Sequence, residues 1–185
     1  METQENPWQI LGSKEKYDNN WINVTEFDVI NPGGGKGIYG KVHFKNIALG
    51  IVALDEEMNL YLIGQYRFTI DKYSWEIPEG GGHLDIDPLE SAKRELLEET
   101  GLKAKQWTLI LNMHLSNCVS DEYSYTYLAT GLEQHTAMPE ESEKLEIKKV
   151  SLDESFEMIE RGEITDSMTI AALQKVKLMQ LEGKL

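Results

Sequence analysis

One segment of the chain carries its own start and stop signals for a helix, and it limits the possible folds more than any other feature. Asp87 can cap the first backbone N–H groups of a helix with its side chain, and Pro88 suits the first helical position. Gly101 readily adopts the left-handed conformation that ends helices, so the helix is predicted to run to about Thr100. Strand patterns lie on both sides of this helix, which predicts an α/β protein with more strand than helix.

Most of the other regular segments have the alternation or the apolar, β-branched content of strands. The predicted strands cover residues 21–30, 38–44, 48–54, 60–67, 75–78, 107–113, 123–130 and 145–150. Two more helices are predicted over residues 152–161 and 166–181. The second is amphipathic, and its inward side is predicted to consist mainly of Ile170, Leu173, Val176 and Leu178. The order lacks the regular strand–helix alternation of a doubly wound sheet.

Residues 33–37 form a glycine-rich run with a lysine, which invites comparison with a phosphate-binding loop. Such a loop needs a G-x-x-x-x-G-K-[ST] pattern that opens a helix. Here Gly37 follows Lys36, and a predicted strand comes next. The run therefore predicts a hairpin turn.

The acidic composition bounds the possible partners. With a net charge of −14, the chain is not expected to bind nucleic acid generally, because phosphate contacts need a basic surface. An anionic phosphate substrate would also be repelled unless cations mediate, which favours a metal-dependent reaction. The same charge also serves solubility, so charge alone does not choose between the two explanations.

Other features of the composition favour a reducing, cytoplasmic setting. The single cysteine, Cys118, cannot form an internal disulfide. No apolar run is long enough for a membrane span, and METQENPWQILGS lacks the basic start and continuous apolar core of a secretion signal. The length of 185 residues favours one domain, or one domain with a small appendage.

Three carboxylates gather on the predicted helix. Glu95, Glu98 and Glu99 stand at i, i+3 and i+4, a spacing that brings Glu95 close to both of the others. Like charges at this spacing repel, whereas a magnesium ion would use them as hard oxygen ligands. Arg94 lies beside them and can fix a carboxylate through a bidentate contact. An acidic, solvated helix face is the alternative, and the spacing alone gives the two interpretations equal weight.

The residues around this helix resemble the Nudix box, G-x5-E-x7-R-E-U-x-E-E-x-G-U, in which U is a bulky aliphatic residue. Gly80 and the run from Arg94 to Leu102 match the box at every specified position except one. The exception is the first glutamate, where the chain has Ile86 between Asp85 and Asp87. This departure removes a supporting carboxylate but leaves the R-E-x-x-E-E group intact.

The Nudix resemblance implies a metal-dependent hydrolase. It implies a site for Mg²⁺, or alternatively Mn²⁺, whose ligands are Glu79 through its backbone carbonyl, Glu95, Glu98 and Glu99. It also implies a catalytic group that includes Arg94 and Glu98, and substrate contacts from Gly80 and Gly81.

The segment QYRFTIDKYSWEIPEGGG resembles the branch of the family formed by ADP-ribose pyrophosphatases and nucleoside-diphosphate-sugar hydrolases, and the likeness covers residues 17–179. That branch uses N-terminal strands for dimerisation, with aromatics that sandwich the nucleobase. The matching aromatics are Trp21 and Tyr39, which ordinary strand aromatics would explain equally well. Arg67 matches a phosphate-contacting arginine, and the alternative is a surface charge at a strand end.

The catalytic base of this branch lies outside the box, in a loop before a late strand. Here that loop reads MPEESEKLEIKKV, which puts Glu143 at the base position and Glu141 second. An acidic, mobile surface loop is the alternative interpretation for either glutamate.

We therefore predict a Nudix α/β/α sandwich with a mixed β-sheet over residues 47–185, preceded over residues 1–46 by an antiparallel β subdomain for dimerisation and base binding. The expected reaction is metal-dependent hydrolysis of the pyrophosphate of ADP-ribose or another nucleoside diphosphate sugar by a cytoplasmic homodimer. One alternative is a Nudix hydrolase of nucleoside triphosphates or dinucleoside polyphosphates. The other is a catalytically silent binding or regulatory module, which only Ile86 supports.

Overall fold

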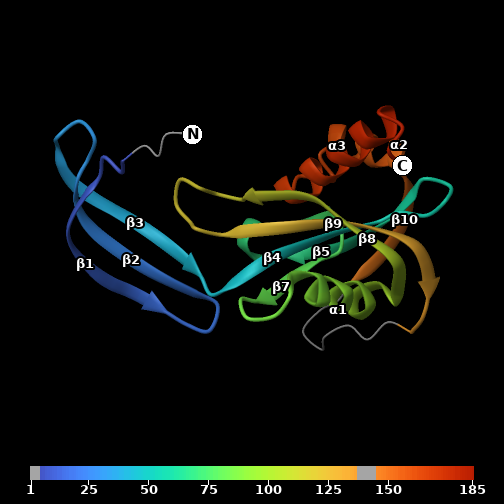
Figure 1. The fold of residues 1–185 in the computed structure, drawn as a ribbon, viewed down its shortest axis with the longest axis horizontal. Coiled ribbons are helices and arrows are strands. Elements are labelled where there is room, and N and C mark those ends of the chain that lie inside the picture. Colours follow the sequence, from blue (N-terminus) through green and yellow to red (C-terminus); the bar gives the residue numbers. More distant parts are fainter. Residues whose placement is uncertain (1–4, 137–144) are drawn as a thin grey trace. The chain divides into compact units, whose positions relative to one another are not determined.

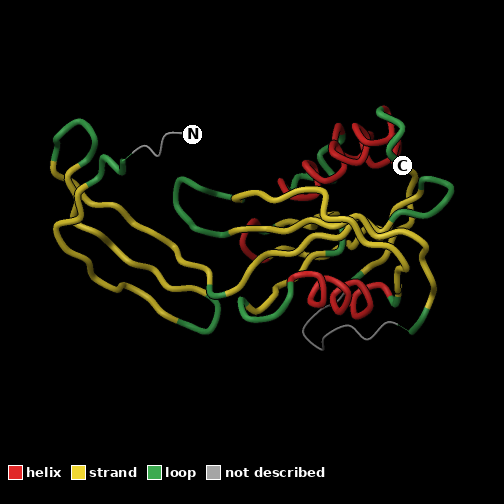
Figure 2. The backbone as a smooth tube through the Cα atoms, viewed as in Figure 1, coloured by secondary structure: helices red, strands yellow, loops and turns green. Residues whose placement is uncertain are grey.

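The chain folds as two compact units. A computed structural model describes residues 5–136 and 145–185. The first unit consists of the residues up to Asn46 together with Ser116–Glu122, and the second consists of Ile47–Leu115 and Tyr123–Leu185. All helices of the described residues belong to the second unit, whereas the first consists of strands and loops (Figure 2).

The first unit is a three-stranded antiparallel sheet in the order β1-β2-β3, formed by β1 (Gln9–Asp18), β2 (Ile22–Ile30) and β3 (Lys36–Phe44). The predicted hairpin turn between β2 and β3 is confirmed. The Asn31 side chain accepts hydrogen bonds from the N–H groups of Gly33 and Gly35, both at 3.0 Å, and Gly34 between them has a φ of +84°. The sequence patterns missed β1, because register shifts near Leu11 and Lys16 interrupt its alternation.

The loop Ser116–Glu122 covers the outer edge of β3. The Val42 N–H donates to the Val119 carbonyl at 2.8 Å, and the Asp121 N–H donates to the Val42 carbonyl at 3.2 Å. The Asp121 carboxylate also lies 2.7 Å from the Lys41 ammonium and 2.8 Å from His43 Nδ1. Although burial alone would raise the pKa of Asp121, these contacts hold it well below its ordinary value. The strand edge is therefore protected by a segment distant in the sequence.

The second unit is a layered α/β structure. Its strands form one sheet in the order β7-β4-β9-β8 and another in the order β10-β5-β6. Their bounds are β4 (Asn46–Ala53), β5 (Asn59–Arg67), β6 (Lys72–Glu76), β7 (Glu79–His83), β8 (Leu102–His114), β9 (Tyr123–Gln134) and β10 (Glu146–Ser151), with a 3-10 turn at Phe68–Ile70 after β5. Because β4 and β9 are parallel while β8 and β9 are antiparallel, the predicted mixed sheet is confirmed.

Helices cover both faces of these sheets. Helix α1 (Pro88–Thr100) lies on one side, and α2 (Leu152–Glu160) and α3 (Ser167–Leu181) lie on the other (Figure 1). β4 therefore buries side chains on both faces. Leu49 and Ile51 pack in a cluster with Leu96 of α1, whereas Val52 packs in a second cluster with Leu173 of α3. The predicted α/β/α sandwich is confirmed, and α1 has the predicted bounds.

Several features of this unit differ from the sequence prediction, among them the strand predicted over residues 75–78, which instead covers Lys72–Glu76 as β6. Leu178 was expected to face inward but is 49% exposed, because it lies more than half a helical turn beyond the buried Val176.

β7 was not predicted, since its glycines argue against a strand. It forms because its backbone pairs with β4. Its glycines leave room for the Glu95 side chain at Gly80 and for Ile47 and Leu49 at Gly82. Within the described ranges, no helix combines the length and the apolar content that crossing a membrane requires.

One buried hydroxyl has no hydrogen-bond partner among the described residues. Thr126 of β9 is fully buried, and its Oγ1 is unpaired. Unsatisfied buried polar groups cost about 1–3 kcal/mol. Thr126→Val keeps the shape and removes the hydroxyl, so we expect it to raise the free energy of unfolding by about 1 kcal/mol in urea denaturation. Thr126→Ser keeps the hydroxyl and should be less stable than wild type. A loss of stability in Thr126→Val would show that the hydroxyl has a partner.

Candidate functional site

The acidic side of α1 is fixed by the caps and the buried face of the helix. Asp87 Oδ1 accepts from the Leu89 N–H at 2.9 Å, and Gly101 ends the helix with a φ of 71°. Leu96 is fully buried against the sheet. With this face anchored, Glu99 is 4% exposed and the Glu95 side chain is 13% exposed. A solvated acidic face therefore does not describe these two carboxylates.

Arg94 ties the acidic side of α1 together and binds it to β7. Its Nη1 donates to Glu98 at 2.6 Å, and its Nη2 donates to Glu95 at 2.5 Å and to the Gly81 carbonyl at 3.2 Å. The guanidinium thus offsets the repulsion between two carboxylates of the helix. It also fixes the distance between the helix and the glycine strand.

The departure at Ile86 leaves a hydrophobic residue on the surface of the box loop, 46% exposed. Of its two acidic neighbours, Asp87 is committed to capping α1. Arg94 reaches the loop side of the site through the backbone, by donating to the Gly81 carbonyl.

Gly80 lets β7 and α1 approach closely. A Cβ atom at Gly80 would overlap the Glu95 carboxylate and would lie only 2.5 Å from each of its oxygens. One residue earlier, the Glu79 N–H donates to Glu99 Oε2 at 3.2 Å. The structure therefore brings together the backbone at Glu79 and Gly80 and the side chains of Glu95 and Glu99.

The donor set on this side of α1 suits a hard divalent cation. It consists of the carboxylate oxygens of Glu95, Glu98 and Glu99 and nearby backbone carbonyls, which are the ligand types that Mg²⁺ prefers. Within the described parts of the chain, no three acidic, histidine or cysteine side chains are grouped closely enough to hold an ion as they stand. Arg94 occupies Glu95 and Glu98 instead, so a cation would compete with its guanidinium for these oxygens.

Arg67 is held by a buried carboxylate at the end of β5. Its Nε donates to both oxygens of Glu76, at 3.1 and 2.9 Å, and its Nη2 also pairs with Glu76 and lies 3.9 Å from Glu79 Oε2. The Glu76 side chain is 5% exposed and that of Arg67 is 37% exposed. The guanidinium is thus fixed in direction and half-buried, close to the residues that precede Gly80.

Glu79 has an unusual electrostatic environment. Burial, together with the nearby charges of Asp166 and Glu76, raises the pKa of the Glu79 carboxyl well above its ordinary value. The Thr169 hydroxyl donates to Glu79 Oε1 at 2.9 Å. The sequence assigned a role only to the backbone of Glu79, and no spacing rule pointed to Thr169 or Asp166, which come from the far end of the chain.

The aromatics assigned to base binding lie apart in the first unit. The Trp21 carbonyl accepts from the Lys45 N–H, whereas Tyr39 pairs with Phe27 across the sheet. Six residues of extended chain separate Tyr39 from Lys45, which is about 20 Å at about 3.3 Å per residue. One copy of the sheet therefore does not bring Trp21 and Tyr39 face to face.

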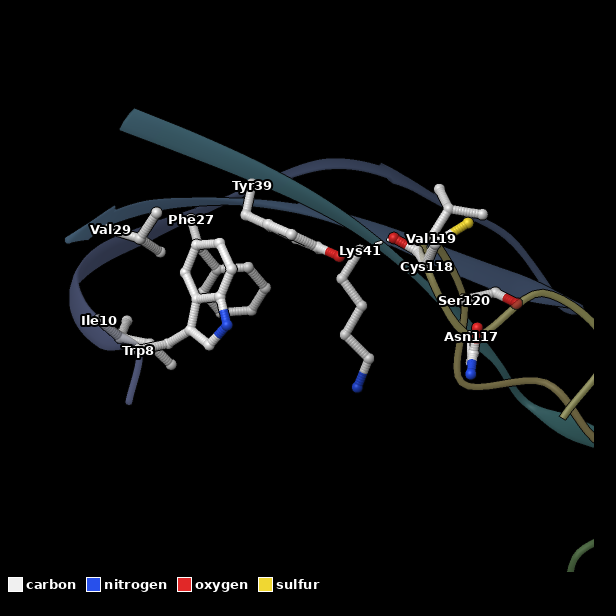
Figure 3. Close-up of a pocket in the computed structure, with 10 residues that line it drawn as sticks. All are labelled: Trp8, Ile10, Phe27, Val29, Tyr39, Lys41, Asn117, Cys118, Val119 and Ser120. Atoms are coloured by element: carbon white, nitrogen blue, oxygen red, sulfur yellow. Dashed lines mark hydrogen bonds between the residues drawn. The ribbon is translucent and has the colours of Figure 1, made fainter. Parts of the chain in front are cut away.

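Tyr39 instead lies beside Trp8, with ring centroids 5.2 Å apart and ring planes at 74° (Figure 3). The Tyr39 hydroxyl donates to the Cys118 carbonyl at 2.7 Å, which fixes the ring. These side chains belong to a pocket of 390 Å³ lined by Trp8, Ile10, Phe27, Val29, Tyr39, Lys41, Asn117, Cys118, Val119 and Ser120. Trp8 was missed because β1, which follows it, was not predicted.

The two glutamates predicted as alternatives for the catalytic base, Glu141 and Glu143, lie outside the described residues. Their assignment stays a prediction.

Comparison with known protein families matches two adjoining parts of the chain. A model described as the NUDIX domain matches residues 45–172, and one described as the nucleoside diphosphate sugar hydrolase N-terminal domain matches residues 8–42. The chain belongs to the Nudix family. The Nudix match contains the whole second-unit site, from Arg67 through the box to Thr169.

Relatives of this Nudix protein carry more than one kind of name. It is 32% identical to a methanol dehydrogenase activator of Bacillus methanolicus over 135 residues, 72% of this chain and 73% of that protein, whereas two others are named as hydrolases. It is 36% identical to an ADP-ribose pyrophosphatase of Mycobacterium tuberculosis over 152 residues, 78% of this chain and 71% of that protein. It is 30% identical to a CMP-5'-(N-acetyl-N-hydroxy-3-aminopropyl)phosphonate hydrolase of Streptomyces rubellomurinus over 171 residues, 91% of this chain and 82% of that protein. The prediction of a Nudix pyrophosphohydrolase agrees with the two hydrolases.

The fold also matches a solved structure titled "Crystal structure of ADP compounds hydrolase". The match has a TM-score of 0.86 and covers 99% of this chain and 100% of the other, at 19% sequence identity. It confirms the fold of the Nudix protein, including its N-terminal strands.

The contact at Gly80 can be tested by adding the missing methyl group. We expect Gly80→Ala to push the Glu95 carboxylate aside and, because Glu95 is a predicted metal ligand, to lower turnover with Mg²⁺ by about ten- to a hundredfold. Stability should change little, because the displaced atoms are the end of a flexible side chain. Gly37→Ala, where a Cβ atom would meet nothing within 4 Å, is the matched control. Equal turnover in Gly80→Ala and wild type would rule out a functional need for this close approach.

Proposed function

We propose that this Nudix protein hydrolyses the pyrophosphate bond of a nucleoside diphosphate sugar, with ADP-ribose as the leading substrate, in the presence of Mg²⁺ or Mn²⁺. The products are a nucleoside monophosphate and a sugar phosphate. The observation that carries the proposal is the close approach of Gly80 to Glu95. Glu95 belongs to an intact R-E-x-x-E-E group, and Glu99 of the same group accepts from the Glu79 N–H. The N-terminal domain match and the relatives' names support the substrate class.

The residues of the site have separate roles in the proposed hydrolysis. Glu95, Glu99 and the Glu79 carbonyl would hold the cation, with Glu98 as a further ligand. A bound divalent cation would neutralise the pyrophosphate oxygens and make a water more acidic. Arg94 sets the direction of the Glu95 carboxylate, and the absence of side chains at the β7 glycines lets phosphate oxygens approach the backbone.

The chemical step needs a base, for which Glu143 is the first choice and Glu141 the second. The base takes a proton from the attacking water, whose oxygen forms a bond to phosphorus. The bridging P–O bond then breaks, and the leaving phosphate departs with the bridging oxygen. Arg67, fixed by Glu76, supplies positive charge for a phosphate group.

The pocket of the first unit is proposed to hold the nucleobase. Trp8 and Tyr39 provide flat rings at its edge, and Lys41 and Asn117 provide polar groups. Relatives named for ADP-ribose and for a CMP conjugate differ in their base, so the pocket is assigned to a base without naming one. The separation of Trp21 from Tyr39 means that a sandwich of both would need two copies.

We further propose a homodimer through the first unit, which the exposed apolar residues of that unit support. Ile10, Trp21 and Ile38 are each between 64% and 68% exposed on a sheet of only three strands. Large apolar side chains with this exposure are candidates for contact with a partner. A second copy of the same sheet would cover them.

A substrate panel with and without Mg²⁺ tests the activity. It contains ADP-ribose, GDP-mannose, UDP-glucose, diadenosine polyphosphates and nucleoside triphosphates. We expect turnover of at least one diphosphate sugar, with loss of activity on chelation by EDTA. Turnover of triphosphates or dinucleotides alone would favour the alternative hydrolase. Inactivity towards every compound would favour the silent module to which Ile86 points.

The two candidate bases can be ranked by substitution. We expect Glu143→Gln to lower kcat by about a hundredfold or more, because general base catalysis contributes about 10²–10⁴-fold. Glu141→Gln is the matched control in the same loop and should lose less. KM should change little in both variants. A larger loss in Glu141→Gln would transfer the role of base to Glu141.

A further inference from the structure

One threonine in the first turn of α3, Thr169, contacts the residues just before the glycines of β7. Thr169 is fully buried. Its Oγ1 accepts a hydrogen bond from the Ile77 N–H at 3.1 Å and donates one to Glu79 Oε1 at 2.9 Å. The Thr169 hydroxyl is therefore hydrogen-bonded to the residues on both sides of Pro78.

Residues 77–79, which lead into Gly80, form the approach segment. Ile77 and Pro78 lie between β6 and β7 and belong to neither strand. Pro78 has no N–H to donate, and its carbonyl accepts from the Ile51 N–H at 2.9 Å. The Glu79 N–H donates to Glu99 at 3.2 Å. The approach segment is thus tied to the sheet, to α1 and to α3.

The start of α3 is itself well fixed. The Thr169 N–H donates to Asp166 Oδ2 at 2.7 Å, which caps the helix. Met168 packs with Ile77 over Gly50, where a Cβ atom would lie 3.0 Å from Ile77 Cδ1 and 3.1 Å from Met168 Sδ. The hydroxyl of Thr169 therefore projects from a rigid support.

We propose that Thr169 is a positioning residue for the metal site. Its hydroxyl holds the approach segment so that the Glu79 carbonyl and the Glu99 carboxylate face the same cation. Thr169 itself touches neither cation nor substrate. This inference rests on the metal site of the proposed function, but it concerns residues that lie outside the Nudix box.

Loss of the hydroxyl would act on the backbone. The Ile77 N–H would lose its partner in a buried place, and Glu79 would lose a donor. A buried N–H without a partner is unfavourable, so the segment would shift to find one. Because the Glu79 carbonyl belongs to the same short segment, it would move as well.

Two substitutions separate the hydroxyl from the packing volume. Thr169→Val keeps the volume and the β-branch but removes the hydroxyl. Thr169→Ser keeps the hydroxyl and removes a methyl group. The full chain is titrated with Mn²⁺ alone, and free Mn²⁺ is followed by electron paramagnetic resonance. We expect Thr169→Val to weaken Mn²⁺ binding about tenfold, as for other residues that orient metal ligands, and Thr169→Ser to bind as wild type does.

A merely structural role gives the opposite order. If Thr169 only fills space, Thr169→Ser leaves a void and is the more damaged variant, and that result overturns the proposal. Equal Mn²⁺ affinity in Thr169→Val and wild type overturns it too. Should Thr169→Val fail to fold, Thr169→Ala replaces it, because Ala and Ser differ only by the hydroxyl.

The inference and the proposed function fail in different ways. Absence of wild-type turnover on the substrate panel would reject the proposed function while the Mn²⁺ comparison could still be made. Wild-type turnover together with an unchanged Mn²⁺ affinity in Thr169→Val would reject the positioning role alone.

Discussion

The close approach of β7 to α1 at Gly80 is the constraint on which the rest of the site depends. A Cβ atom there would overlap the Glu95 carboxylate, so only glycine allows the strand backbone and the acidic helix to share one small volume. Arg94 maintains the approach from the helix side through Glu95, Glu98 and the Gly81 carbonyl. The sandwich provides rigid support, since Leu96 beneath these residues is fully buried. The low strand propensity of β7 is therefore explained by the Glu95 carboxylate, which needs the space that a side chain at Gly80 would fill.

The sequence predicted those parts of the fold whose signals are local. α1 has the predicted bounds because its cap, its first proline and its terminal glycine are all within the segment. β1 was missed because register shifts interrupt its alternation, and β7 was missed because its strand character comes from pairing with β4, a strand distant in the sequence. The error at Leu178 lay in the prediction itself, because two residues of helix place Leu178 about 200° around the axis from Val176, on the opposite side.

The same distinction applies to the site. Glu95, Glu98, Glu99 and Arg94 follow a motif with fixed spacing, and Arg94 ties Glu95 and Glu98 to the glycines of β7. Thr169 and Asp166 act on residues about ninety positions earlier, and that contact exists only in the folded chain. Trp8 illustrates the same limit in the first unit, where its partner Tyr39 belongs to another strand. Motifs identify residues that perform chemistry, whereas the residues that hold them in place are dispersed along the chain.

The acidic residues of the site are stabilised in three different ways, which explains how a chain with a net charge of −14 can gather them. Glu76 and Glu95 are paired with guanidinium groups. Glu99 accepts a backbone N–H from the neighbouring strand. Glu79 is largely buried, its nearest guanidinium is that of Arg67 at 3.9 Å, and burial raises the pKa of its carboxyl. A cation can therefore compete with Arg94 for the carboxylates of α1, whereas the Glu79 carboxyl is held by burial and by the Thr169 hydroxyl.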